Sequence, residues 1–219
     1  MKYTKIAFLG DSITEGALAS KEENIYHQVV AKDLGVTCLN YGKSGTRIAK
    51  QKDPKNEWDY MDFQMRMKDI PTDCSFVFVF GGTNDYGHGD ALIGDFESYD
   101  PYTFIGGLRN IIEYLCKTFS KERICFLLPP HRYNEDDGRG ECGNAKKIPY
   151  KPLSAYVKAM EKVISSYEID MIDLRTLWDV PSSDKPNLYV QDGLHPNDKG
   201  HILIAKTIEE YLKKKAKKQ

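Results

Sequence analysis

Three residue types that cooperate in acyl transfer, a serine, a histidine and a carboxylate, occur in two short polar segments near opposite ends of the chain. Ser12 lies within GDSITEG at residues 10–16, and Asp192 stands three residues before His195 in DGLHPN. At this spacing the carboxylate can hold one imidazole nitrogen while the other nitrogen faces a serine hydroxyl, as orienting group, base and nucleophile do in acyl transfer. The alternative for DGLHPN is a solvated loop followed by a helix cap.

The segment around Ser12 also fits a purely structural role. Ser12 followed three residues later by Glu15 is a helix capping box, and Asp11 and Ser12 are common in strand-to-helix turns. In the functional interpretation, Ser12 is a nucleophile at a helix N-terminus and its backbone N–H faces a developing oxyanion. The two roles compete for the Ser12 hydroxyl, whereas the N–H can serve either.

Two further segments offer donors for an oxyanion. Residues 40–46 (NYGKSGT) contain Gly45, whose N–H could face the site, and residues 81–85 (GGTND) contain Asn84, whose side-chain amide could do the same. The alternative for residues 40–46 is a plain glycine turn, and residues 81–85 taken alone favour an ordinary turn. Residues 40–46 do not make a phosphate loop, because Thr37 stands where that motif needs a glycine.

These segments need a sheet to bring them together. Five apolar runs of strand length alternate with stretches of helical spacing, which predicts parallel strands with helices on both faces. Residues 76–80 are apolar at every position, as expected of a central strand buried on both sides. Ligands gather beyond the carboxyl ends of such strands, so the polar segments are expected at one edge. The expected strands are 5–9, 36–40, 75–80, 123–128 and 170–174, and the expected helices are 25–34, 104–119, 153–167 and about 198–215.

The combination of blocks resembles a known family, the SGNH (GDSL) hydrolases. The blocks occur in the family's order and span nearly the whole chain: Gly10-Asp11-Ser12, Gly45, Gly82-Thr83-Asn84-Asp85 and Asp192-x-x-His195. The resemblance implies one domain over residues 1–219, with a flavodoxin-like three-layer α/β/α sandwich and a five-stranded parallel sheet in the order 2-1-3-4-5.

The resemblance also implies a role for each matching residue. Ser12 would be the nucleophile, His195 the base and Asp192 the carboxylate that orients it. The oxyanion hole would consist of the N–H groups of Ser12 and Gly45 and the side chain of Asn84. The implied activity is hydrolysis of a small-molecule ester through an acyl-enzyme, and no cofactor or metal is expected.

Two long segments that follow strands, residues 86–102 and 131–152, have neither strand nor helix spacing and are candidate walls of the substrate site. Their side chains are aromatic but polar, which favours short-chain acyl esters such as acetylated carbohydrates over long acyl chains. Substrate contacts are expected from Asp11, Tyr86, His131 and Tyr133.

Three other functions deserve comparison. The family's range also includes lysophospholipases and thioesterases that act on lipids. A non-catalytic binding module on the same fold would be expected to have lost Ser12, Asp192 or His195, and all three are present. A nucleotide or flavin protein would need a glycine-rich phosphate loop after the first strand, where acidic residues stand instead.

Composition excludes several broad classes. The 219 residues include 31 Lys+Arg and 32 Asp+Glu, and this balance argues against a dedicated nucleic-acid binder. Hydrophobic residues make up 41% and aromatic residues 11%, enough for a sizeable core. The longest apolar run, residues 76–80, is far shorter than the roughly 20 residues of a membrane span. The sequence therefore predicts a water-soluble globular domain.

The histidines and cysteines point to neither metal nor disulfide chemistry. His88 near Asp85 and Asp90, and His195 with His201, lack a strong metal-ligand spacing, so His88 and His201 are expected in loops or at the surface. Five cysteines without a C-x-x-C pair, together with an amino terminus typical of a first strand, predict reduced thiols and a cytoplasmic location.

Overall fold

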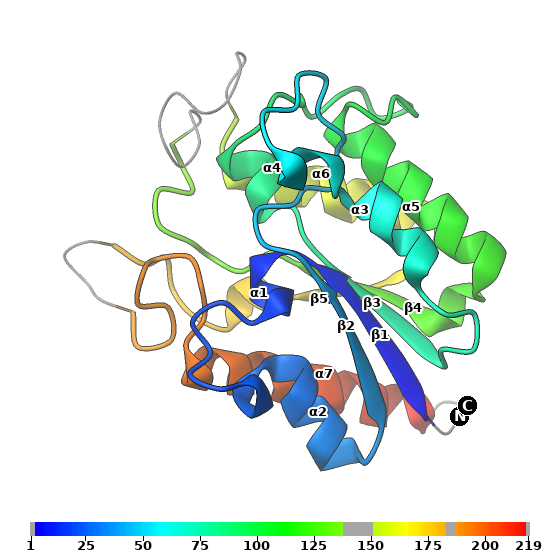
Figure 1. Ribbon diagram of the computed structural model, residues 1–219, viewed down its shortest axis with the longest axis vertical. Helices are drawn as coiled ribbons and strands as arrows, with labels where there is room; N and C mark the ends of the chain where they lie inside the picture. Colours follow the sequence, from blue (N-terminus) through cyan, green and yellow to red (C-terminus); the bar gives the residue numbers. More distant parts are fainter. Residues whose placement is uncertain (1–2, 138–150, 183–186, 218–219) are drawn as a thin grey trace.

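A five-stranded parallel sheet forms the centre of the protein and is covered by helices on both faces (Figure 1). The computed structural model describes residues 3–137, 151–182 and 187–217. The strand order is β2-β1-β3-β4-β5, which confirms the predicted fold class and topology. The strands are β1 Lys5–Gly10, β2 Thr37–Gly42, β3 Phe76–Phe80, β4 Ile124–Leu128 and β5 Asp170–Asp173.

The long helices agree with the predicted ranges, whereas three short helices appear where no periodicity predicted them. Every boundary of a predicted strand or long helix lies within two residues of its observed position. The helices are α1 Ser12–Glu15, α2 Tyr26–Leu34, α3 Phe63–Arg66, α4 Thr83–Gly87, α5 Phe104–Thr118, α6 Leu153–Ser166 and α7 Asp198–Ala216. Single 3₁₀ turns cover Glu22–Asn24, Glu57–Tyr60, Met67–Asp69, Lys121–Arg123 and Leu174–Thr176.

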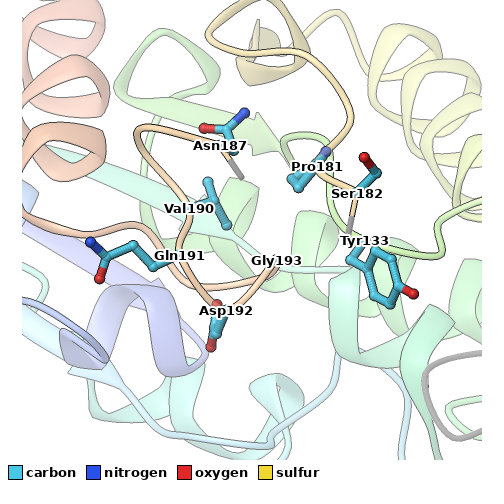
Figure 2. Close-up of a pocket in the computed structure, with 8 residues that line it drawn as sticks. All are labelled: Tyr133, Pro181, Ser182, Asn187, Val190, Gln191, Asp192 and Gly193. Carbon is cyan, nitrogen blue, oxygen red and sulfur yellow. The ribbon is translucent and has the colours of Figure 1, made fainter. Parts of the chain in front are cut away.

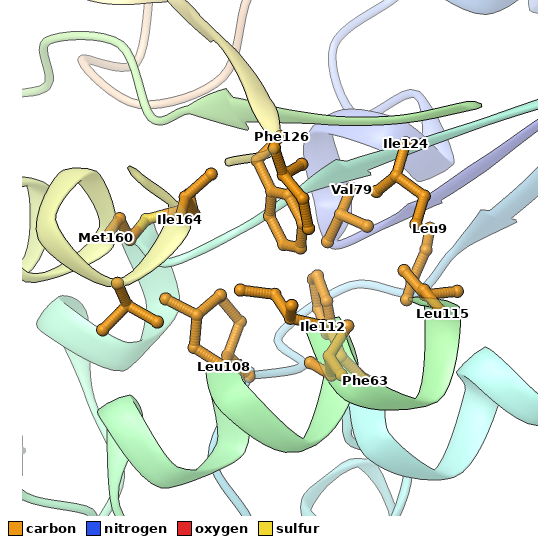
Figure 3. Close-up of a cluster of buried hydrophobic side chains, with 14 of the residues drawn as sticks. Leu9, Phe63, Val79, Leu108, Ile112, Leu115, Ile124, Phe126, Met160 and Ile164 are labelled. Atoms are coloured by element: carbon orange, nitrogen blue, oxygen red, sulfur yellow. The ribbon is translucent and has the colours of Figure 1, made fainter. Parts of the chain in front are cut away.

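The central strands serve two separate cores, because successive side chains of a strand point to opposite faces. Leu9 and Val79 pack against α5 and α6 (Figure 3). Phe8 and Phe78 lie on the other face against α2 and α7, and their rings stack with centroids 5.2 Å apart. Burial on both faces explains why every position of β3 is apolar.

The carboxyl ends of three neighbouring strands lie level with one another. Gly10 at the end of β1 pairs with Gly42 of β2 and with Phe80 of β3. A Cβ on Gly42 would stand 2.1 Å from the backbone nitrogen of Glu15, so glycine here lets α1 pack directly against the end of β2. The polar segments that follow these strands therefore start from one edge of the sheet, as expected.

The described residues contain neither a membrane-spanning helix nor a disulfide. None of the helices in the described ranges is both long enough and apolar enough to cross a bilayer. Four cysteines carry free thiols, namely Cys38, Cys74, Cys116 and Cys125, and Cys142 lies outside the described residues.

Candidate active site

The predicted serine, histidine and carboxylate lie together at the carboxyl edge of the sheet. Ser12 Oγ is 2.9 Å from His195 Nε2, across 183 positions of sequence, and His195 Nδ1 is 2.6 Å from Asp192 Oδ2. A carboxylate bonded to Nδ1–H leaves Nε2 as the acceptor for a hydroxyl proton. This continuous chain of hydrogen bonds is the arrangement that nucleophilic acyl transfer requires.

Ser12 is the first residue of α1, but it is not the cap of that helix. The N-cap is Asp11, whose Oδ1 accepts the N–H of Ile13 at 3.0 Å. Glu15 does not reach back to complete a capping box and accepts the backbone N–H of Ser44 at 2.7 Å instead. The structural interpretation of the Ser12–Glu15 pair is therefore wrong, and the serine hydroxyl faces His195.

The loop before α7 sets the orientation of His195. Besides holding the ring, Asp192 accepts the backbone N–H groups of Leu194 at 2.9 Å and His195 at 2.6 Å through Oδ1. Partial burial alone would raise the pKa of Asp192, but these hydrogen bonds from His195 and Leu194 outweigh it and bring the pKa below its ordinary value. The Tyr133 N–H donates to the Gly193 carbonyl at 2.6 Å and fixes the loop from its other side.

Gly45 is held in a conformation that favours glycine. Its φ is +74°, in the left-handed region where L side chains are strained. Apart from Gly45 itself and its two chain neighbours, no atom of the described residues lies within 4 Å of the place where a Cβ of Gly45 would stand. Its backbone therefore borders open space on the edge of the sheet from which Ser12 also rises.

The side chains of α4 are fixed to the segment that follows Gly45. Asn84 is buried and donates one amide N–H to the Thr46 carbonyl at 3.0 Å, which leaves its second N–H for another acceptor. The fully buried Asp85 accepts the backbone N–H groups of Ile48 at 3.0 Å and Ala49 at 2.9 Å. The ordinary turn considered for this sequence is thus the first turn of a helix that carries a preoriented amide.

Replacing Asn84 tests whether its amide stabilises an oxyanion. We expect Asn84→Ala to lower kcat by about 10²–10³-fold with little change in KM, because one donor to the transition state is lost. Steady-state kinetics on a short aryl ester measure this. Asn110→Ala is the control, because the Asn110 amide on α5 donates to Gln64 instead. An Asn84→Ala variant with activity within a few-fold of wild type would exclude the amide from the mechanism.

Two of the four expected substrate contacts are buried. Asp11 is fully buried, and its Oδ2 has no hydrogen-bond partner among the described residues. Burial raises the pKa of Asp11 to about 6, although the Ile13 N–H and the nearby His195 act in the opposite direction. Tyr86 is 1% exposed, belongs to the core and donates its hydroxyl to the Asp137 carbonyl at 2.8 Å. Because α4 turns Tyr86 inward, it does not form the exposed wall that was predicted for it.

The other two expected contacts, Tyr133 and His131, line cavities close to the loop that carries His195. A cavity of about 240 Å³ lies beside Asp192 (Figure 2). Its lining consists of Tyr133, Pro181, Ser182, Asn187, Val190, Gln191, Asp192 and Gly193. His131 lines a neighbouring cavity of about 600 Å³, and its Nδ1 lies 2.8 Å from Glu135 Oε1. The predicted wall at residues 131–152 thus begins at these cavities, while residues 138–150 lie outside the described ranges.

A buried polar cluster contacts α1 through Thr14. His27 donates from Nε2 to the Thr14 carbonyl at 3.1 Å, and the Thr14 and Tyr26 hydroxyls lie 2.9 Å apart. His201 stacks on Tyr26 with ring centroids 6.0 Å apart. Both histidines are 0% exposed, so the surface position predicted for His201 is wrong. Burial lowers the pKa of each histidine from 6.5 to about 4.

This cluster predicts loss of stability in acid. The unfolded chain protonates both histidines below pH about 6.5 while the folded protein keeps them neutral to about pH 4, so stability falls as pH falls through that range. We expect each histidine to change the free energy of unfolding by about 1.4 kcal/mol per pH unit in this range. The total change is then roughly 3 kcal/mol for each histidine. Urea unfolding of His27→Gln and His201→Gln at several pH values measures it.

The comparison with wild type is essential in this experiment, because Asp11 titrates in the same range with the opposite sign. Its raised pKa stabilises the fold at low pH, and that contribution is lost as pH rises through about 6. The slope difference between wild type and each histidine variant cancels this contribution. Slopes that are equal in wild type and in both variants would contradict the assignment.

Sequence reasoning missed Arg66, whose buried guanidinium contacts two strand ends at the site. The residue belongs to no motif, and α3 is too short to show helical periodicity. The only local signal was that Arg66 stands between two methionines, Met65 and Met67.

Comparison with known proteins agrees with this geometry. The model of the GDSL-like lipase/acylhydrolase family matches residues 8–203. A structure from Lactobacillus plantarum is 28% identical with a TM-score of 0.78, over 98% of each chain. A search of curated proteins found no match.

Two structures with named activities share the fold at lower identity. An acetyl xylan esterase is 21% identical with a TM-score of 0.65, over 94% of this chain and 98% of its own. A carbohydrate acetylesterase from Sinorhizobium meliloti is 15% identical with a TM-score of 0.66, over 95% of this chain and 98% of its own. Because the family model spans most of the sequence and includes every polar segment of the site, the chain belongs to the GDSL-like lipase/acylhydrolase family of ester-hydrolysing enzymes.

Proposed function

We propose that this protein is a serine esterase that removes short acyl groups, with acetylated carbohydrates as its substrate class. The observation that carries the proposal is the unbroken chain from Ser12 Oγ through His195 to Asp192, with hydrogen bonds of 2.9 and 2.6 Å. A serine, a histidine and a carboxylate in this order are the parts of nucleophilic acyl transfer.

In the proposed reaction, His195 Nε2 accepts the Ser12 proton as Oγ attacks the ester carbonyl carbon. The carbonyl oxygen becomes an oxyanion that accepts hydrogen bonds from the N–H groups of Ser12 and Gly45 and from the Asn84 amide. The imidazolium then returns the proton to the departing alcohol, and an acyl-enzyme forms. Water deprotonated by His195 attacks this ester, and the acid leaves as Ser12 recovers its proton.

The cavity beside Asp192 supports a small substrate. Its volume of about 240 Å³ lies below the roughly 300–1,000 Å³ of typical small-molecule pockets. Its described lining mixes polar side chains with Tyr133, Pro181 and Val190, and its small volume leaves little room for a long acyl chain. The names of the two acetylesterases that share the fold make acetylated sugars the first natural substrates to test.

A chain-length series tests this proposal. Wild-type enzyme is assayed on 4-nitrophenyl esters from acetyl to dodecanoyl and on acetylated xylo-oligosaccharides, and a fluorophosphonate probe reports the reactive serine. We expect kcat/KM to be highest for acetyl, the sugar esters to be turned over and the probe to label Ser12. A maximum at dodecanoyl would instead indicate a lipid acylhydrolase. Absence of both turnover and labelling would indicate a binding module.

A further inference from the structure

Arg66 is a buried cation that connects separate segments of the site. It is 6% exposed, and its hydrogen bonds in the described ranges go to neutral oxygens and not to a carboxylate. Nη2 donates to the Gly10 carbonyl at 3.1 Å and to Thr46 Oγ1 at 2.7 Å, and Nε donates to the Met61 carbonyl at 2.8 Å. Nη1 donates to the Tyr41 carbonyl. All four acceptors are neutral, and three of them lie at or just beyond the carboxyl ends of β1 and β2.

Two of these three acceptors lie within two residues of a proposed oxyanion donor. The Gly10 carbonyl ends β1, two residues before Ser12. Thr46 directly follows Gly45, and its carbonyl accepts the Asn84 amide at 3.0 Å. One guanidinium thus contacts Thr46, which adjoins Gly45 and accepts the Asn84 amide, and also Gly10, which lies two residues before Ser12.

A guanidinium suits this position better than an ammonium would. Its planar fork presents five N–H donors in fixed directions, so it can hold several acceptors without moving. Burial lowers the pKa of Arg66 to about 10, and the nearby carboxylates Asp11 and Asp62 act in the opposite direction, so the side chain stays charged at neutral pH. Burying this charge costs free energy, which the four hydrogen bonds of the guanidinium offset.

We propose that Arg66 is a positioning residue that sets the geometry of the oxyanion hole by holding Gly10, Tyr41 and Thr46 in register. The inference rests on the proposed esterase function, because it concerns the same site. In this role Arg66 acts through Gly10, Tyr41 and Thr46, which lie in the segments that carry the donors, and not through a contact with the substrate. Its contribution therefore belongs to the transition state and not to ground-state binding.

The test compares Arg66→Lys and Arg66→Met with Arg123→Met. Arg123 is the matched control, because its guanidinium donates to the carbonyls of Ser75, at 3.2 Å, and Cys74, just before β3 and at the opposite end of the sheet. We expect Arg66→Met to lower kcat about 10–100-fold on 4-nitrophenyl acetate with KM within about twofold, because small displacements of catalytic groups are costly. Arg66→Lys should lose less, and Arg123→Met should lose stability without losing kcat.

A transition-state analogue separates positioning from general damage. Phenylboronic acid forms a tetrahedral adduct with the serine, and an adduct oxygen occupies the oxyanion hole. We expect its Ki to rise in the Arg66 variants by the same factor by which kcat/KM falls, as a loss of transition-state binding requires. Thr46→Val removes one acceptor and keeps the guanidinium. This variant should likewise raise the Ki and lower kcat/KM, each by several-fold. This variant also tests the proposal if the Arg66 variants do not fold.

Three results would overturn this inference. Folded Arg66 variants with wild-type kcat would show that the contacts do not matter for the reaction. Equal losses in the Arg66 and Arg123 variants, in proportion to Tm, would show a purely structural role. A change in KM alone would assign Arg66 to substrate binding. Wild-type enzyme without turnover or fluorophosphonate labelling would instead refute the proposed function, and this inference with it.

Discussion

Ser12→Ala is expected to lower kcat on 4-nitrophenyl acetate by about 10⁶-fold and to abolish fluorophosphonate labelling. The reason is that Oγ, 2.9 Å from His195 Nε2, is the atom that would form the acyl-enzyme. Loss of a nucleophilic serine in a triad has an effect of this size, because the remaining members have no bond-forming partner. Activity and labelling are measured on the same purified protein, together with its Tm.

Ser44→Ala provides the control for this prediction. Ser44 also follows a strand at the same edge of the sheet, but its hydroxyl donates to Glu15 and not to a histidine. We expect Ser44→Ala to retain turnover within a few-fold and to be labelled as wild type is. Persistent labelling of Ser12→Ala, or equal loss of activity in both variants, would assign the nucleophile elsewhere.

Asp192→Asn is expected to lower kcat by about 10⁴-fold with little change in Tm. The asparagine oxygen can still accept the N–H groups of Leu194 and His195, so the loop should keep its shape. The amide that replaces Oδ2 would donate to His195 Nδ1, and the ring would then carry its proton on Nε2. That tautomer cannot accept the Ser12 proton, which explains the large expected loss.

Asp198→Asn is the control for this carboxylate. Asp198 lies six positions further along, and its carboxylate accepts the Ser20 N–H at 2.8 Å and the Ser20 hydroxyl at 2.6 Å instead of a histidine. We expect it to affect stability more than kcat. The pKa of Asp192 lies below its ordinary value, so its carboxylate is charged throughout the neutral range. Loss of this carboxylate in Asp192→Asn should therefore lower activity over that whole range. A folded Asp192→Asn enzyme within tenfold of wild type would remove this carboxylate from the mechanism.

Local sequence predicted the strands, the long helices and their order along the chain, whereas the strand order within the sheet was implied by the family resemblance. The fully apolar run at Phe76–Phe80 predicted a central strand, and β3 is buried at every position. Long helices such as α5 and α6 repeat their apolar positions over several turns, so their ends were predicted to within one residue. The helices α1, α3 and α4 have four or five residues, too few for a period of 3.6 to be recognised.

Residue types and spacing determined which chemistry the chain can attempt. Asp192 and His195 stand three positions apart, so their interaction is local, and one turn brings them to 2.6 Å. The role of Ser12 could not be decided in this way, because a capping serine and a nucleophilic serine have the same local sequence. The tertiary structure decided it by placing Asp11 at the cap and His195 beside the hydroxyl.

Burial of polar side chains was decided by the tertiary structure. Tyr86 and His201 carry polar groups, and Arg66 is charged, yet all three lie inside the fold. Their hydrogen-bond and stacking partners come from distant segments, such as Asp137 for Tyr86 and Tyr26 for His201. The cost of burying a polar group is offset only by such partners, and a local pattern does not contain them. The residues that could react were therefore identified from the sequence. The buried residues that support them, such as Arg66 and His201, were identified only in the tertiary structure.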